Sequence, residues 1–253
     1  MKVVRNRLCV GLWLFFFLIA PAPAYAFSFA VFGDSCKGDV TYEKLLKKTT
    51  EDPDISFAIH LGDFALNGQL KEYEKHIKFN RLCGIPIYHV KGNHDAVYSG
   101  YKYFRFFFGP SYFSFDYENS HFLILDNALK GNFTENQYKW MIKNLKENKK
   151  DHTFVFFHKP TFDVTNFFPD FIMDNRQMGA LMMEDFKKYK IDYVFSGHLH
   201  AYGRAARDGV VYITSGGAGS PLHLPFFAGG FFHYMKITVD NGKITDEVIK
   251  IYD

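Results

Sequence analysis

The sequence predicts one layered α/β sandwich domain, and three observations support this fold class. Short β-rich runs alternate with helical stretches, a pattern typical of right-handed βαβ units. Some β-rich runs follow one another directly, so antiparallel strand pairs are expected beside the parallel ones. The chain has 253 residues with 30 Phe and 16 Tyr, which is enough apolar material for one domain with an aromatic core.

The individual elements are predicted in chain order from composition and from boundary residues. Helices are expected at 40–52, 69–84, 134–148 and 176–190. Strands are expected at 27–33, 55–63, 86–95, 112–118, 121–127, 152–160, 192–200, 209–217 and 231–240, followed by a final hairpin. The hairpin is expected to turn at Asn241-Gly242, and the strands on either side of Asn119-Ser120 are expected to pair with each other.

The first 26 residues have the pattern of an export signal. Three basic residues precede an uncharged apolar run at 8–20, and Ala-Tyr-Ala at 24–26 is the small-x-small pattern that signal peptidase cuts. The apolar run is shorter than the roughly 20 residues of a membrane-spanning helix. We expect a cleaved signal peptide at 1–26 and a domain at 27–253 that is secreted or periplasmic and not stably inserted in a membrane. An uncleaved N-terminal anchor is the alternative.

The charge balance bounds the partners of the chain. Residues 1–26 hold three basic and no acidic residues. The rest of the chain has 27 basic and 27 acidic side chains. A net charge near zero gives no general attraction for nucleic acid or for an anionic membrane. No nucleic-acid partner is therefore expected beyond nucleotide substrates, and the composition does not indicate an oligomeric state.

Polar side chains of one chemical kind follow five of the predicted strands. They are Asp34, Asp63, Asn93 with His94 and Asp95, His158, and His198 with His200. Each piece alone is common in turns or in cores, but open α/β sheets bind ligands at this carboxyl edge of their strands. Carboxylates, an amide and imidazoles suit two borderline cations, and a shared carboxylate bridges ions ~3.5–4 Å apart in two-metal hydrolysis. The two histidines of GHLH, two apart on an extended segment, are expected to point the same way.

These motifs resemble the calcineurin-like metallophosphoesterases, and specifically their secreted branch near the purple acid phosphatases. The resemblance rests on Gly-Asp at 33–34, GDFALNG, GNHD, the isolated His158 and GHLHAYGR, and it runs from about Phe27 to Gly217. It implies a four-layer α/β/β/α sandwich, in which a β-sandwich carries helices on both faces. It also implies two metal ions, for which iron, zinc and manganese are the candidates, and a small phosphate-ester substrate.

The resemblance further implies a role for each matching residue. Asp63 resembles the bridging carboxylate, Asp34 and His200 resemble ligands of one metal, and Asn93, His158 and His198 resemble ligands of the other. His94 resembles the group that contacts the phosphate and protonates the leaving oxygen, held by Asp95. Such a site hydrolyses phosphate monoesters or diesters, because a metal-bridging hydroxide attacks phosphorus in line while an imidazole donates a proton. Two alternatives stay open: a cyclic-nucleotide or other phosphodiesterase, and an impaired family member that binds phosphate esters without turnover.

Cys36 departs from the family pattern. The family has Asp-x-His where this chain reads Asp34-Ser35-Cys36, and the tyrosine that purple acid phosphatases place after the bridging aspartate is here Leu66. Either Cys36 is a thiolate ligand, which Zn²⁺ or iron accepts, or it is a bystander and water fills the coordination gap. A disulfide with Cys83 is not expected, because the two cysteines are predicted at opposite edges of a parallel sheet.

Further histidines and one loop receive separate interpretations. Buried positions are expected for His60 and His89, which lie inside predicted strands, whereas His76 is expected on the solvent face of a helix. Either His223 or His233 is a candidate contact for the substrate. The stretch 161–175 shows no clear periodicity and is hypothesised to be a lid that shapes specificity.

Overall fold

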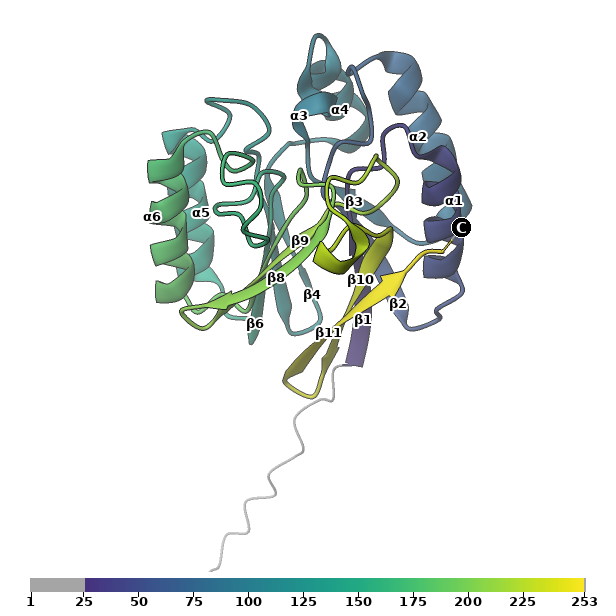
Figure 1. The fold of residues 1–253 in the computed structure, drawn as a ribbon. Coiled ribbons are helices and arrows are strands. Elements are labelled where there is room, and N and C mark those ends of the chain that lie inside the picture. The colour runs from purple at the N-terminus through teal and green to yellow at the C-terminus, as the bar shows by residue number, and fades with distance from the viewer. Residues whose placement is uncertain (1–25, 253) are drawn as a thin grey trace, which may run out of the picture.

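The chain forms two mixed β-sheets that pack face to face, with helices on their outer faces (Figure 1). The computed structural model describes residues 26–252, so the expected signal peptide lies outside the described residues except for Ala26. None of the helices within this range is long and apolar enough to cross a membrane. The four-layer α/β/β/α sandwich is confirmed.

The first sheet carries the N-terminal strands. Its strand order is β11 (Lys243–Lys250), β10 (His233–Asp240), β1 (Ala26–Phe32), β2 (Ile55–His60) and β3 (Ile87–His89). The last three run parallel, so their carboxyl ends lie at one edge. The predicted hairpin at Asn241-Gly242 joins β10 and β11 in antiparallel register.

The second sheet is built from the middle of the chain. Its strand order is β4 (Phe113–Tyr117), β5 (Ser120–Ile124), β6 (His152–Phe156), β7 (Tyr193–Ser196), β9 (Val210–Ser215) and β8 (Tyr202–Arg207). The predicted antiparallel pair around Asn119-Ser120 is confirmed as β4 and β5. Strands β5, β6, β7 and β9 run parallel, while β8 returns antiparallel to β9.

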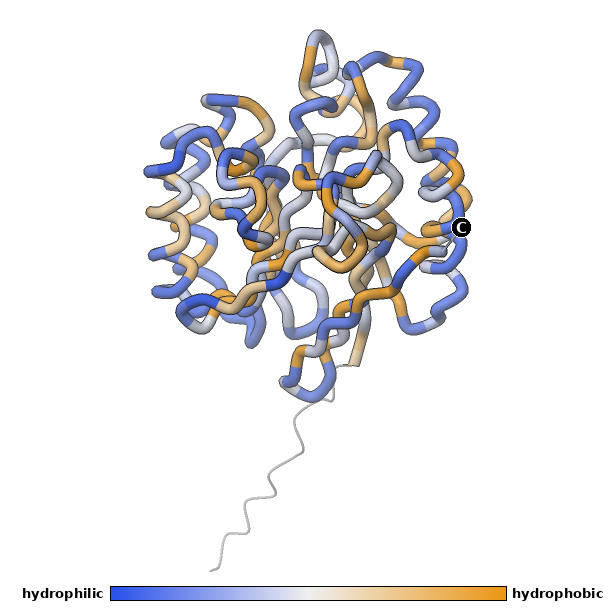
Figure 2. The backbone as a smooth tube through the Cα atoms, viewed as in Figure 1, coloured by the Kyte–Doolittle hydropathy of each residue, from blue (hydrophilic) through white to orange (hydrophobic). Residues whose placement is uncertain are grey.

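Two pairs of helices form the outer layers. Helices α1 (Asp39–Thr50) and α2 (Leu70–Cys83) lie beside the first sheet, and α5 (Glu135–Glu147) and α6 (Arg176–Lys188) cover the second (Figure 1). Each helix turns its apolar stripe inward, so hydrophilic residues dominate the outside of the molecule in Figure 2.

An aromatic core fixes the two sheets against each other. Phe29 of β1 stacks on Phe57 of β2 with ring centroids 5.4 Å apart. From the opposite sheet, Phe122 and Phe154 meet Phe29 edge-on at 5.2 and 5.1 Å. Because such pairs prefer defined geometries, this core sets how the carboxyl edges of the two sheets face each other.

Several sequence expectations are wrong in detail. Strand β8 was not expected, because YGRAAR lacks alternating apolar residues, and it is held by its pairing with β9. The third predicted strand ends at His89, and GNHD instead opens the short helix α3 (Asn93–Ala96). The aromatic run that follows forms α4 (Gly100–Phe108), whose Phe104 is buried in a small cluster with Tyr73 of α2.

The interior of the molecule tests the predictions for His76 and for the two cysteines. His76 is 3% exposed, so its expected place on a solvent face is wrong. Its ring stacks on Phe64 and its Nε2 lies 3.0 Å from Nε2 of the buried His89. Cys36 and Cys83 form no disulfide, as the sequence predicted, and both are buried.

Candidate metal centre

The predicted ligands meet where the carboxyl edges of the two sheets face each other. Asp34 and Asp63 follow β1 and β2 of the first sheet, whereas His158 and His198 follow β6 and β7 of the second. Asp34, Asp63 and His198 have φ values of 62°, 57° and 70°, a left-handed conformation that costs energy for residues with a side chain. His198 is therefore not on an extended segment, contrary to expectation, and strained backbone of this kind is concentrated at functional sites.

Three side chains form the tightest group of candidate ligands. The ligand atoms of Asp63, His158 and His198 all lie within 4.8 Å of one another. His158 Nε2 is 3.3 Å from Asp63 Oδ2 and 3.2 Å from His198 Nδ1. The same nitrogen lies 3.0 Å from Asn93 Oδ1. The four residues expected around the second metal, the bridging Asp63 included, are therefore all present together.

The charges of these side chains favour a cation among them. His158 Nδ1 lies 2.8 Å from the Leu61 carbonyl oxygen and donates to it, so Nε2 either carries a second proton toward Asp63 or offers its lone pair to a cation. Although burial lowers the pKa of His158, the charge of Asp63 and the hydrogen bond to it raise it to about 9. Burial raises the pKa of Asp63, but the charge of His158 lowers it to about 2. A positive charge among these side chains stabilises the ionised carboxylate of Asp63. The donor set therefore fits a metal ion.

Asp34 and His200 form the other half of the site. His200 Nε2 lies 3.6 Å from Asp34 Oδ1, and its Nδ1 lies 2.8 Å from the Pro221 carbonyl oxygen. Both oxygens of Asp34 accept from the backbone N–H of His198. Burial raises the pKa of Asp34 well above its usual value, so its ionised form also needs nearby positive charge.

Glycines let the backbone approach these carboxylates. A Cβ at Gly197 would come within 2.6 Å of Asp34 Oδ2, and one at Gly216 within 2.8 Å. A Cβ at Gly92 would overlap Oδ1 and the backbone nitrogen of Asp63. Glycine at positions 92, 197 and 216 is thus explained by the space that the two carboxylates occupy.

His94 is held at the site, but not by Asp95. His94 donates its backbone N–H to Asp63 Oδ1 at 2.9 Å, and its Nδ1 lies 2.8 Å from the Leu66 carbonyl oxygen. Asp95 instead accepts from the backbone N–H groups of Asp63, Ala65 and Gly92. The expectation that Asp95 holds the His94 ring is wrong; Asp95 ties the GDFALNG loop to GNHD.

Comparison with known proteins identifies the family of the chain. The family model described as calcineurin-like phosphoesterase matches residues 27–202. The chain belongs to this family. It is 30% identical over 119 residues to a purple acid phosphatase from Glycine max, a match that covers 45% of this chain and 25% of that protein. The chain therefore spans about a quarter of the length of this plant relative.

Two further similarities extend over more of the chain. A probable glycerophosphodiester phosphodiesterase GpdQ from Arcobacter nitrofigilis is 24% identical over 199 residues, covering 72% of this chain and 69% of that protein. The solved structure of purple acid phosphatase PPD1 from yellow lupin seeds superposes with a TM-score of 0.74 at 18% identity. That superposition covers 92% of this chain and 54% of the lupin chain, and it supports the phosphoesterase fold.

Cys36 is not a member of the group formed by Asp63, His158 and His198, and its side chain has another partner. Its Sγ lies 3.3 Å from Ser220 Oγ, and Ser220 in turn donates to the Cys36 carbonyl oxygen at 2.7 Å. Burial raises the pKa of the Cys36 thiol to about 12. This contact favours the second of the two hypotheses for Cys36, in which the thiol is not a metal ligand.

The sequence left His223 and His233 as alternative contacts for the substrate, and only one of them lies at the site. His233 is fully buried and bonds Ser215 and the Phe231 carbonyl, so it does not reach the site. His223 stacks on His200 with ring centroids 4.1 Å apart, and its Nδ1 accepts from the His200 backbone N–H at 3.3 Å. Of the two candidates, His223 is the one at the metal centre.

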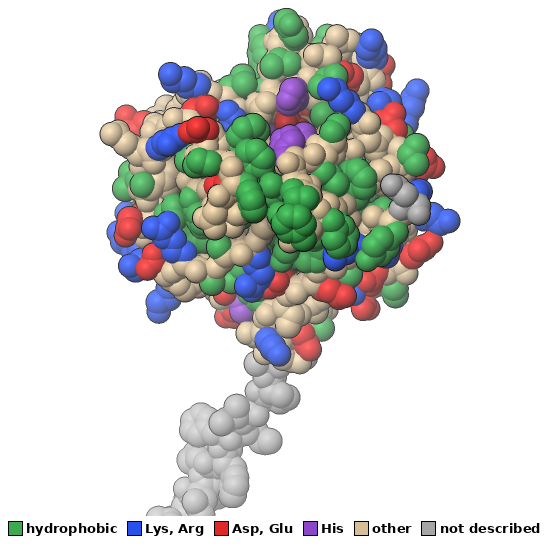
Figure 3. Space-filling view, in the orientation of Figure 1, with side chains coloured by type: hydrophobic (Ala, Val, Ile, Leu, Met, Phe, Trp, Pro, Cys, Tyr) green, Lys and Arg blue, Asp and Glu red, His purple; other side chains and the backbone are tan. Residues whose placement is uncertain are grey.

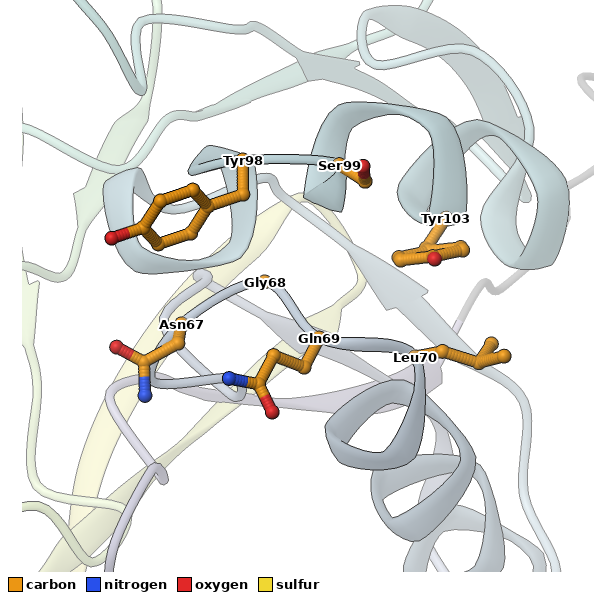
Figure 4. A pocket seen from close by; sticks show the side chains of 7 residues that line it. All are labelled: Asn67, Gly68, Gln69, Leu70, Tyr98, Ser99 and Tyr103. Atoms are coloured by element: carbon orange, nitrogen blue, oxygen red, sulfur yellow. The ribbon is translucent and has the colours of Figure 1, made fainter.

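A cavity of about 500 Å³ lies beside the GDFALNG loop, past its Leu66. It is lined by Asn67, Gly68, Gln69, Leu70, Tyr98, Ser99 and Tyr103. Figure 4 shows Asn67, Gly68 and Gln69 on the loop that leads into α2 and Leu70 at the start of that helix; Tyr98 and Ser99 lie between α3 and α4, and Tyr103 lies on α4. None of the lining residues belongs to the ligand group.

Proposed function

We propose that the protein hydrolyses phosphate monoesters or diesters with two metal ions. The observation that carries this proposal is the convergence of Asp63, His158 and His198, with Asp34 and His200 alongside. Asn93, His158 and His198 would hold one ion, Asp34 and His200 the other, and Asp63 both. Two such cations supply positive charge for the phosphoryl oxygens and make a coordinated water more acidic. Iron, zinc and manganese remain the candidates.

The residues of the chain prepare the site for this reaction. The carbonyls of Leu61 and Pro221 orient the rings of His158 and His200, so that Nε2 of each is available as a ligand. Leu66 fixes His94 in the same way, which leaves His94 Nε2 to contact the phosphate and to hold or release a proton. Cys36, which bonds Ser220, is not assigned a ligand role in this proposal.

A phosphodiester is the second candidate substrate within the same chemistry. The similarity to the probable glycerophosphodiester phosphodiesterase covers 72% of this chain, against 45% for the soybean purple acid phosphatase.

Export and cleavage of residues 1–26 also remain predictions. Fractionation of the host tests export, and retention of the protein in the cytoplasm would refute it. N-terminal sequencing tests cleavage: an N-terminus at Phe27 would support a cleaved signal peptide, and an uncleaved chain would support the anchor.

Hydrolysis of phenyl phosphate and of bis(p-nitrophenyl) phosphate by the full chain tests the proposal. Asp63→Asn is expected to lower kcat/KM for the hydrolysed ester by at least about 1,000-fold, because it removes the shared carboxylate. Asp208→Asn is the matched control, because Asp208 also has a positive φ, 54°, but lies in an exposed turn between β8 and β9. Binding of phosphate without turnover of either ester would favour the impaired family member instead.

A further inference from the structure

The side chains of Phe168 and Phe171 form an aromatic wall against the histidines of the candidate metal centre. The Phe171 ring lies 5.8 Å from the ring of His198 and 5.7 Å from that of His223, between centroids. Phe168 lies 6.0 Å from His223 and 5.3 Å from Phe171. Because His223 stacks on His200, the wall reaches both histidines of GHLH.

The loop that presents this wall is held in place by specific contacts. Residues 161–175 form no helix or strand, yet Asp163 accepts hydrogen bonds from the backbone N–H groups of Thr165 and Phe168. Phe168 packs on the buried cluster of Leu199, Ala201 and Leu224. Phe171 donates its N–H to the Phe168 carbonyl oxygen at 3.0 Å, so its ring is presented from an anchored turn.

The wall continues into an exposed apolar surface. Phe171 is 40% exposed, and Phe167, Phe226 and Phe227 are 56%, 59% and 89% exposed. Figure 3 shows hydrophobic side chains gathered just below the histidines in the upper middle of this face. Apolar surface that borders a few convergent polar groups is the usual composition of a small-molecule site.

We propose that this wall binds the alcohol part of the substrate, and that the protein therefore selects phosphate esters of apolar alcohols over esters of glycerol or sugars. The inference rests on the proposed function, because it places the phosphate at the metal centre. A phosphate bound at the metal centre next to His198 would have Phe171 beside it, so an aryl or alkyl group on its ester oxygen would exchange water for aromatic contact. Phe171 is then a specificity-determining residue.

Binding of ethyl-, butyl- and hexylphosphonate, measured by calorimetry on the full chain as purified with its metals, tests this inference without requiring turnover. These probes share one head group and differ only in apolar length. We expect Kd to fall about two- to fourfold for each added methylene that the wall covers. Phe171→Ala should flatten this dependence while ethylphosphonate still binds, and Phe171→Leu should keep most of it.

Two control variants locate the contact. Phe106→Ala removes another exposed phenylalanine, 80% exposed on α4, and should leave the chain-length dependence unchanged. Tyr98→Ala removes an aromatic ring from the cavity beside the GDFALNG loop, and it should also leave the dependence unchanged. Loss of the dependence in Tyr98→Ala but not in Phe171→Ala would overturn the assignment to the wall.

The two proposals fail in different ways. If phenyl phosphate is hydrolysed in an Asp63-dependent manner but Kd is the same for all three phosphonates, the wall has no role in selection and only this inference falls. If the phosphonates bind with the expected dependence but neither test ester is hydrolysed, the wall stands and the proposed hydrolysis falls.

Discussion

His158 Nε2 lies 3.3 Å from Asp63 Oδ2, although the two residues follow strands of different sheets. The candidate metal centre is therefore assembled by the packing of one sheet on the other, and neither sheet holds all of its residues. The phenylalanines between the sheets act on the site through this placement, because close-packed rings allow little sliding.

A buried ion pair also spans the two sheets. Lys91 Nζ, past the end of β3, lies 2.6 Å from Asp126 Oδ2, past the end of β5, and both side chains are buried. Lys91→Met leaves the Asp126 charge buried without its partner, so we expect a loss of about 3–5 kcal/mol in the free energy of unfolding. Urea denaturation measures this loss. The exposed Lys75–Asp39 pair provides the control, because Lys75→Met should cost no more than about 1 kcal/mol. Equal effects in the two variants would contradict a structural role for the Lys91–Asp126 pair.

The contact of Cys36 with Ser220 predicts that the thiol is dispensable for metal binding. Cys36→Ser should retain the metal content of the wild type, because a hydroxyl still reaches Ser220 Oγ. His200→Ala should lose one ion per chain, because it removes an imidazole that faces Asp34. Elemental analysis of the purified variants distinguishes them. Loss of one ion from Cys36→Ser would instead support the hypothesis that Cys36 is a thiolate ligand.

Gly92 is expected to tolerate no side chain. A methyl group there overlaps Asp63, so Gly92→Ala should displace the shared carboxylate and lower both metal content and ester hydrolysis by at least about tenfold. Gly179→Ala in α6 is the matched change, since its Cβ would sit in ordinary contact, 3.6 Å from the Thr161 carbonyl oxygen. That variant should be neutral or stabilised by up to about 1 kcal/mol. A fully active, metal-loaded Gly92→Ala protein would rule out this account of the glycine.

The buried histidines predict a loss of stability in acid. Burial, with neighbouring His60 and His89, holds the pKa of His76 well below its usual value, and burial lowers the pKa of His89 to about 3. Below a pH of about 6.5 the unfolded chain protonates these rings and the folded chain does not, so stability falls as the pH drops. Each ring contributes up to about 1.4 kcal/mol per pH unit.

His76→Gln isolates this contribution. Between pH 6 and pH 4.5, the unfolding free energy of the variant should fall less steeply than that of the wild type, as measured by urea denaturation at several pH values. Parallel curves for the two proteins would show that His76 is protonated in the folded state as well.

The sequence predicts the fold because its strands and helices alternate with clear composition. It also predicts that the candidate ligands lie together, because they follow strand ends. It does not predict β8, whose YGRAAR lacks apolar alternation and pairs only because β9 lies beside it. It also misplaces His76, since a helix position shows its burial only when α4 packs across it.

Within the site, side-chain contacts decide what motifs leave open. The GNHD motif places Asp95 next to His94 in sequence, but the backbone N–H groups of the neighbouring loop occupy its carboxylate. Likewise, Cys36 stands at a ligand position of the motif, yet its sulfur bonds Ser220 from a distant loop. Neither partner is visible from local sequence, because both arise from segments brought together by the sandwich.

The central claim is that the two sheet edges together form a two-metal centre, and the metal content of the full chain tests it most directly. The protein, purified without chelators, would be analysed by element and referred to the chain concentration. Two ions of iron, zinc or manganese per chain are the predicted result. One ion or none per chain would contradict it, because the site built from Asp34, Asp63 and His200 would then be incomplete.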